Sequence, residues 1–215
     1  MRPLPARRGA SATSSPVSGS SSSRVSRRGS GGIAPRLPSH PATVVPVEDR
    51  DLVALQIGRR PRAFRRVAAR CPFGNPAVTE QEAYDDTGAP FPTTYYLTCR
   101  HLTSAVSRLE AAGGVERWSA AIAASPELQA DLADATARQQ RIRRSLAGPR
   151  TGADDGTSLD SGIGGSRNPA QLKCLHAHVA FALAQPGYRT GESILEEAVD
   201  PWPTDACCFS ESRSS

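Results

Sequence analysis

Three cysteines lie far apart in the sequence, each in an unusual local context. Cys71 lies in RCPFGNP, Cys99 in TYYLTCR and Cys174 in KCLHAH. Thiolate and imidazole are the ligands that zinc and iron–sulfur clusters prefer in proteins. Ligands from separate elements would therefore close one metal site and hold the fold together. The expected ligands are Cys71, Cys99 and Cys174, with His176, His178, Cys207 or Cys208 as the fourth.

The segment KCLHAH limits how these side chains can act together. On a regular helix Cys174 and His178 are separated by about 40° and share a face, whereas His176 lies about 200° from Cys174. One regular helix therefore cannot direct all three to one ion. Either Cys174 acts with His178, or the helix begins later and the CLH segment is partly unwound. The non-functional alternative is a buried helix that carries a small thiol and a hydrogen-bonded core histidine.

The glycine-rich segment GIGGSRNP is a second candidate site. Glycines that lead into a helix N-terminus can hold an anion through backbone N–H groups, and a helix start is expected at Asn168-Pro169. The residues expected to bind the anion are Gly162, Gly164, Gly165 and Arg167. With Cys99 as an activated thiol beside a helix N-terminus, this would be an enzyme acting on a phosphorylated or otherwise anionic small molecule. A flexible loop before a capped helix is the alternative.

A run of arginines precedes Cys71 and suggests a third function. Alternation along a strand would place several of them on one face, suited to RNA or to an acidic partner. They are Arg59, Arg60, Arg62, Arg65, Arg66 and Arg70. An RNA-binding accessory domain is thus a further alternative, against a plain solvated sheet face. Paired catalytic carboxylates, a nucleophile elbow and a histidine-helix metalloprotease motif are missing, so no motif identifies a substrate.

Composition separates an N-terminal arm from the rest of the 215-residue chain. Residues 1–46 are rich in Arg, Ser and Pro, with seven arginines and no Asp or Glu, and are expected to be disordered. The whole chain has 26 basic and 21 acidic residues, and without the arm 19 basic and 21 acidic residues remain, a net charge of −2. The basic character therefore belongs to the arm, which would contact nucleic acid only nonspecifically.

A single domain is expected over residues 47–206, with a flexible loop near 148–166 and a C-terminal tail at 207–215. No stretch approaches the roughly 18 to 20 apolar residues of a membrane span. The N-terminus lacks the apolar region of a secretory signal, so the expected location is the cytoplasm. In that reducing compartment five scattered cysteines are seldom disulfides.

Local patterns predict an α+β fold, with a small antiparallel sheet of about three strands packed against four to five helices. A short helix from Asp49 ends at Gly58, and strands follow on both sides of the turn CPFGNP and at TTYYLTC. Helices are then expected over 102–112, around Trp118, over 126–146, from Asn168 to Gln185 and at SILEEAV. The seam Leu128, Leu132, Ala135, Gln139, Ile142 and Leu146 of the third helix favours packing within the chain over a coiled-coil dimer.

Five segments together resemble a known family. RCPFGNPAV, FPTTYYLTC, SRLEAAGG, GIGG and KCLHAHVAFALA, in this order, are similar to the bacterial, largely actinobacterial, domain of unknown function 501 family. The resemblance spans roughly residues 49–202 and implies that the cysteine-bearing motifs of the family fall on Cys71, Cys99 and Cys174, with His176 beside the last. It implies a shared metal or thiol site. It implies no reaction, because the family has no established activity.

Overall fold

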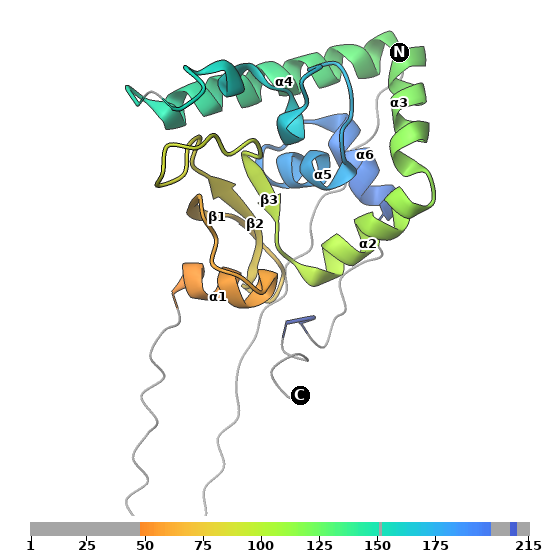
Figure 1. Cartoon of the computed structure of the whole chain (residues 1–215). Helices are drawn as coiled ribbons and strands as arrows, with labels where there is room; N and C mark the ends of the chain where they lie inside the picture. The colour runs from red at the N-terminus through yellow and green to blue at the C-terminus, as the bar shows by residue number, and fades with distance from the viewer. Residues whose placement is uncertain (1–47, 151, 199–206, 210–215) are drawn as a thin grey trace, which may run out of the picture. The chain divides into compact units, whose positions relative to one another are not determined.

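The computed structural model describes residues 48–150, 152–198 and 207–209, all within one compact unit that spans residues 45–215. The arm predicted over residues 1–46 lies outside the described residues, as does most of the predicted C-terminal tail. Elements are numbered as in Figure 1.

A three-stranded antiparallel sheet is formed by the first half of the domain, as predicted. Its strands are β1 (Phe64–Arg70), β2 (Pro76–Gln81) and β3 (Tyr95–Leu97), in the order β1-β2-β3. The β1–β2 turn is the CPFGNP segment, in which Cys71 N–H donates to Asn75 O at 2.9 Å. Gly74 has φ +79°, a conformation that residues with a Cβ rarely adopt. The central strand β2 is buried along its whole length.

Within the described residues, six helices and two short 3-10 helices complete the fold. They are α1 (Asp49–Ile57), α2 (Arg100–Ala111), α3 (Gly114–Ala124), α4 (Pro126–Ala147), η1 (Thr157–Asp160), η2 (Ile163–Gly165), α5 (Leu175–Ala184) and α6 (Arg189–Ala198). The α+β class is confirmed. The predicted flexible loop near 148–166 contains both 3-10 helices in its described part.

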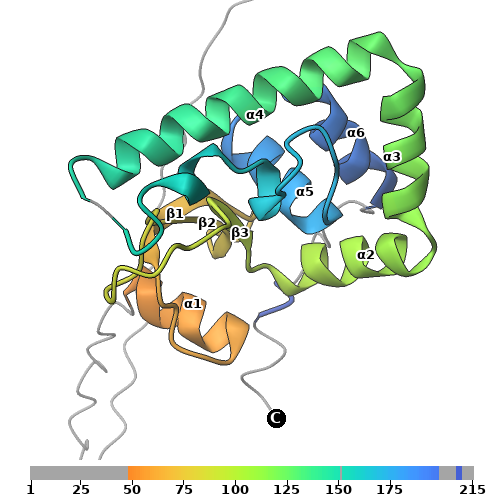
Figure 2. The same cartoon turned by 45° about the horizontal axis from the view of Figure 1, so that its top comes forward.

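Helix α5 is the central element of the packing. It lies against β3, α2, α6 and the η2 loop, as both views show (Figures 1 and 2). Seven of its ten residues are buried, which fits the apolar sequence LHAHVAFALA. The Phe181 ring makes edge contacts with the rings of Tyr95 and Tyr188, at centroid distances of 5.7 and 5.8 Å. These contacts tie the sheet and the segment before α6 to α5.

Helix α4 is positioned by signals that are visible in the sequence. Ser125 Oγ accepts the Leu128 N–H at 3.2 Å, and Pro126 occupies the first turn, as expected for a helix start. Leu132, Ala135 and Gln139 of the predicted seam are buried within the chain. Asp131 of α4 accepts the Thr190 N–H at 2.7 Å and so caps the first turn of α6.

The start of α5 differs from the prediction. A helix was expected from Asn168, but α5 begins at Leu175. The Asn168 side chain accepts the Ala170 N–H at 3.1 Å, and the Asn168 carbonyl accepts the Gln171 N–H at 3.0 Å, so this segment forms a turn. Cys174 is extended, with φ −157° and ψ 143°. The alternative in which the helix begins later, with the CLH segment partly unwound, is therefore the one observed.

Candidate metal site

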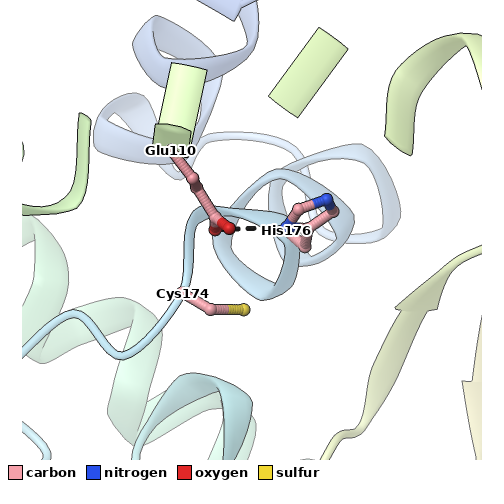
Figure 3. A group of neighbouring side chains, drawn as sticks. All are labelled: Glu110, Cys174 and His176. Atoms are coloured by element: carbon pink, nitrogen blue, oxygen red, sulfur yellow. Dashed lines mark ion pairs between the residues drawn. The ribbon is translucent and has the colours of Figure 1, made fainter. Parts of the chain in front are cut away.

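Glu110, Cys174 and His176 place one ligand atom each within 4.8 Å of one another. The carboxylate comes from the last turn of α2, whereas the thiol and the imidazole come from the start of α5 (Figure 3). His176 Nδ1 lies 3.1 Å from Glu110 Oε1, and the Cys174 side chain points to the same space (Figure 3). The three side chains thus offer sulfur, nitrogen and oxygen donors to one point.

The extended conformation of Cys174 makes this arrangement possible. Because the helix begins only at Leu175, Cys174 and His176 are not held on opposite faces of one helix. Leu175 N–H, the first free donor of α5, points to α2 and donates to Glu110 Oε1 at 2.5 Å. Glu110 therefore both stabilises the N-terminus of α5 and fixes the distance between the two elements.

The imidazole of His176 has partners on both nitrogens. Its Nε2 lies 3.2 Å from the Thr103 carbonyl oxygen and 3.2 Å from Ser107 Oγ, both on α2. A hydrogen bond with the Cys174 thiol and the adjacent Glu110 carboxylate raise the pKa of His176 to about 9, although partial burial acts to lower it. The charged imidazolium is thus favoured at neutral pH while no metal ion competes with the proton.

A cavity of about 380 Å³ adjoins Cys174 and His176. Strand β3 and the loop before it form one side of its wall, and α2, α5 and the η2 loop form the rest. The lining residues are Thr93, Tyr95, Tyr96, Leu97, Thr103, Gly164, Cys174, His176 and Ala177. The wall is mainly apolar with hydroxyl groups.

A family model described as "Protein of unknown function (DUF501)" matches residues 67–196, more than half of the chain. The chain belongs to this family. Neither the curated proteins nor the solved structures contain a match. The matched range of the DUF501 domain includes Glu110, Cys174 and His176, and it ends before Cys207 and Cys208.

The remaining predicted ligands are placed elsewhere in the DUF501 chain. Cys99 Sγ lies 3.8 Å from Cys208 Sγ, and Cys207 Sγ accepts a hydrogen bond from Asn75 in the turn that begins at Cys71. The described residues contain no group of ligand atoms within 4.8 Å of one another that combines Cys174 with another cysteine. The five thiols are thus divided between two places.

His178 is not beside Cys174. Its ring is buried, and Nδ1 lies 2.8 Å from Tyr188 Oη. Burial lowers the pKa of His178 to about 4, which keeps the ring neutral at ordinary pH. This is the environment of a core histidine, the alternative that the sequence left open for this position.

The GIGG segment does not precede a helix directly. Its Gly162 N–H donates to Ser166 O at 2.8 Å and its Gly165 N–H donates to Gly162 O at 3.0 Å, so these donors are used within the loop. A Cβ on Gly164 would lie 2.9 Å from Ala177 Cβ, and one on Gly165 would lie 2.5 Å from Pro92 Cβ. The glycines allow the loop to approach α5 and the segment before β3, and Gly164 forms part of the cavity wall. Arg167, the remaining predicted anion ligand, is exposed.

Four of the six arginines of the predicted RNA-binding strand pair with carboxylates. Arg66 makes two hydrogen bonds to Glu80, at 2.7 and 3.0 Å, and Arg65 contacts Glu80 and Glu82. Arg62 pairs with Asp85, and Arg70 with Asp49. These carboxylates neutralise most of the positive charge that RNA phosphates would need.

Glu110 is the site residue that sequence reasoning missed. It lies in SRLEAAGG, one of the five segments of the family resemblance, but its spacing on a predicted surface helix gives no sign of a ligand. Only the packing of α2 against α5 brings it to Cys174 and His176. Among the described residues, no helix combines the length and apolar character that crossing a membrane requires.

Proposed function

We propose that the protein binds a zinc ion through Cys174 Sγ, His176 Nδ1 and the Glu110 carboxylate, with one coordination position directed to the adjoining cavity. The observation that carries this proposal is the convergence of three different donor atoms within 4.8 Å of one another. Thiolate, imidazole and carboxylate are all established zinc ligands, and three protein ligands with a fourth open position are typical of zinc sites that exchange ligands.

The surroundings of the three side chains suit metal binding. With zinc on His176 Nδ1, the opposite nitrogen would donate its proton to the Thr103 carbonyl, 3.2 Å away. Glu110 Oε1 already accepts the Leu175 N–H. Hydrogen bonds of this kind, one shell out from the metal, orient the ligands of natural zinc sites. Zinc would also replace the proton on Nδ1, so binding releases protons and weakens as the pH falls.

The cavity defines what the open position can reach. Its volume of about 380 Å³ and its mixture of tyrosine, threonine and aliphatic side chains suit a small molecule with a polar group directed to the metal. A zinc ion there would supply Lewis acidity. We also propose that the protein acts in the cytoplasm, where reducing conditions keep its thiols available as ligands.

Zinc content per chain tests the proposal. The full chain, purified under reducing conditions without oxygen, is compared with Cys174→Ser and His176→Gln by elemental analysis after removal of loosely bound metal. Each variant is expected to hold one zinc ion fewer than the parent chain. Glu116→Gln, which changes an exposed carboxylate one helix further on, serves as the control and keeps the full content. Equal zinc content in the parent and in both folded variants would refute the proposal.

A second candidate function is thiol chemistry at the same site. Cys174 is half-buried at the N-terminus of α5, beside an imidazole and a cavity, which are the surroundings of many nucleophilic cysteines. Cys99, the reactive thiol expected from the sequence, is only 2% exposed and is therefore the poorer candidate. Alkylation of Cys174 that is equally fast with and without zinc would favour this second function over metal binding.

A further inference from the structure

The other four cysteines gather at a separate place near one end of the sheet. Cys71 begins the β1–β2 turn, Cys99 lies between β3 and α2, and Cys207 and Cys208 belong to the short described segment near the C-terminus. Cys71, Cys99 and Cys207 are only 6%, 2% and 8% exposed. No disulfide joins them, although Cys99 Sγ and Cys208 Sγ are 3.8 Å apart.

Contacts connect the four thiols in a series. Cys207 Sγ accepts a hydrogen bond from Asn75, in the turn that begins at Cys71. Cys208 follows Cys207 directly in the chain, and its Sγ lies 3.8 Å from Cys99 Sγ. The order of neighbours is thus Cys71, Cys207, Cys208 and Cys99, so that residues from three distant parts of the chain meet.

Backbone and amide N–H groups surround these sulfurs. Cys207 Sγ accepts from the Asn75 side-chain amide at 3.1 Å and from Phe209 N–H at 3.5 Å. The backbone N–H groups of Phe73 and Asn75 point to Cys71, and that of His101 points to Cys208. Such donors hydrogen-bond to a thiolate more strongly than to a neutral thiol. They would therefore help to stabilise thiolates once a cation offsets the cost of burying the charge.

We propose that Cys71, Cys99, Cys207 and Cys208 form a second metal site, which binds a structural zinc ion through four thiolates. Four sulfurs at about 2.3 Å from a tetrahedral zinc ion are separated by about 3.8 Å from one another. The Cys99–Cys208 distance of 3.8 Å matches this separation. It is also shorter than the separation of the cysteine sulfurs around a cubane [4Fe–4S] cluster, each of which binds a different iron, so it favours a single ion over that cluster.

Metal binding requires the four thiols to move closer together. Among the described residues, no three of these sulfurs lie mutually within 4.8 Å. Cys207 and Cys208 lie in a short turn, and the proposal requires that rotation of their side chains brings the four sulfurs around one ion. The site is independent of the one at Cys174, so either can exist without the other.

X-ray absorption at the zinc edge on the full-length Cys174→Ser protein, purified without oxygen, tests this inference. The expected result is about one zinc per chain with a first shell of four sulfurs at about 2.3 Å. No bound zinc, or a first shell made mainly of nitrogen and oxygen, would overturn it. Because this variant keeps all four cysteines of the second site, the result is independent of whether the Cys174 site binds metal.

Removal of one thiol then identifies the ligands. In the Cys174→Ser background, a further Cys99→Ser or Cys208→Ser change is expected to abolish the remaining zinc. Zinc content that persists in both double variants would overturn the assignment. A Cys99–Cys208 disulfide found by mass spectrometry in the oxygen-free protein would also overturn it, because a disulfide leaves neither sulfur as a thiolate. If a double variant fails to fold, the absorption spectrum of the single variant still decides.

Discussion

The two groups of cysteine ligands differ in composition, burial and access. The group at Cys174 combines three donor types, its His176 and Glu110 side chains are 28% and 25% exposed, and it adjoins a cavity of about 380 Å³. The group at Cys71 contains sulfur alone, is largely buried and is lined with N–H donors. On the two proposals, the protein has a mixed site that adjoins a cavity, here called the open site, and a buried all-sulfur site, here called the closed site.

This difference in composition and access indicates two separate roles, whereas the sequence predicted a single metal site. A mixed site with an open side can exchange a ligand, whereas a closed all-sulfur site holds distant parts of the chain together. The turn after β1, the end of β3 and residues 207–209 meet at the closed site. Stability is therefore expected to depend on the closed site, and any chemistry on the open one.

The largest expected effect is the loss of thermal stability on removal of metal from the closed site. A ligand at about 1,000 times its Kd contributes about 4 kcal/mol to stability, so a strong chelator should lower the Tm by roughly 10 °C in a chain of this size. Differential scanning calorimetry of the full chain with and without chelator measures this shift.

Two variants test whether this fall in Tm comes from the closed site. Cys174→Ser should retain nearly the whole chelator-dependent shift, whereas Cys99→Ser should lose most of it and melt early without chelator. A shift that disappears in Cys174→Ser and persists in Cys99→Ser would reverse the two roles.

A second prediction concerns the reactivity of the thiols. In metal-free, folded protein Cys174 should react with iodoacetamide about ten times faster than Cys71 or Cys99, because it is the more exposed thiol. Added zinc should slow the reaction of Cys174. Time-resolved peptide mass spectrometry gives the individual rates, and a similar rate at all three cysteines would remove the distinction between open and closed sites.

The smaller of the two expected effects on stability concerns the wall of the cavity. Gly164 has φ +71°, and an added Cβ would lie 2.9 Å from Ala177 Cβ. Gly164→Ala should therefore lower the free energy of unfolding by about 2 kcal/mol, from backbone strain and a steric clash. Gly88→Ala is the matched control, since Gly88 has φ +78° with no atom within 4 Å of the added Cβ.

Gly88→Ala is expected to lower the free energy of unfolding by about 1 kcal/mol, because only the backbone conformation is strained. Urea unfolding measures both values. Equal losses in the two variants would show that the loop around Gly164 yields to the added methyl group and does not define the wall.

The fold was predictable because its signals are local. The turn CPFGNP, the cap at Ser125 and the glycine after α1 each act over a few residues, and the structure has the corresponding elements. The predicted start of α5 at Asn168 was wrong for a related reason. Asn168-Pro169 is an equally good sequence for a turn, and the side chain of Asn168 stabilises that turn.

The site was less predictable because it depends on tertiary contacts. Glu110 reaches Cys174 only through the packing of α2 on α5, and an acidic residue near the end of a surface helix gives no local sign of this. Cys207 was assigned to a tail because little around it favours a helix or strand, yet it is only 8% exposed. Residue types indicated thiol ligands, but only the fold shows which thiols are neighbours.

The hydrogen bond from Asn75 to Cys207 joins positions that are 132 residues apart. During synthesis the turn at Asn75 therefore leaves the ribosome on the order of 10 s before its partner, at common elongation rates. Throughout that interval the nascent hairpin has an uncovered thiol at Cys71, which can be captured by a wrong thiol or metal ion. On the second-site proposal, all four cysteines can therefore bind one zinc ion only after Cys208 has left the ribosome.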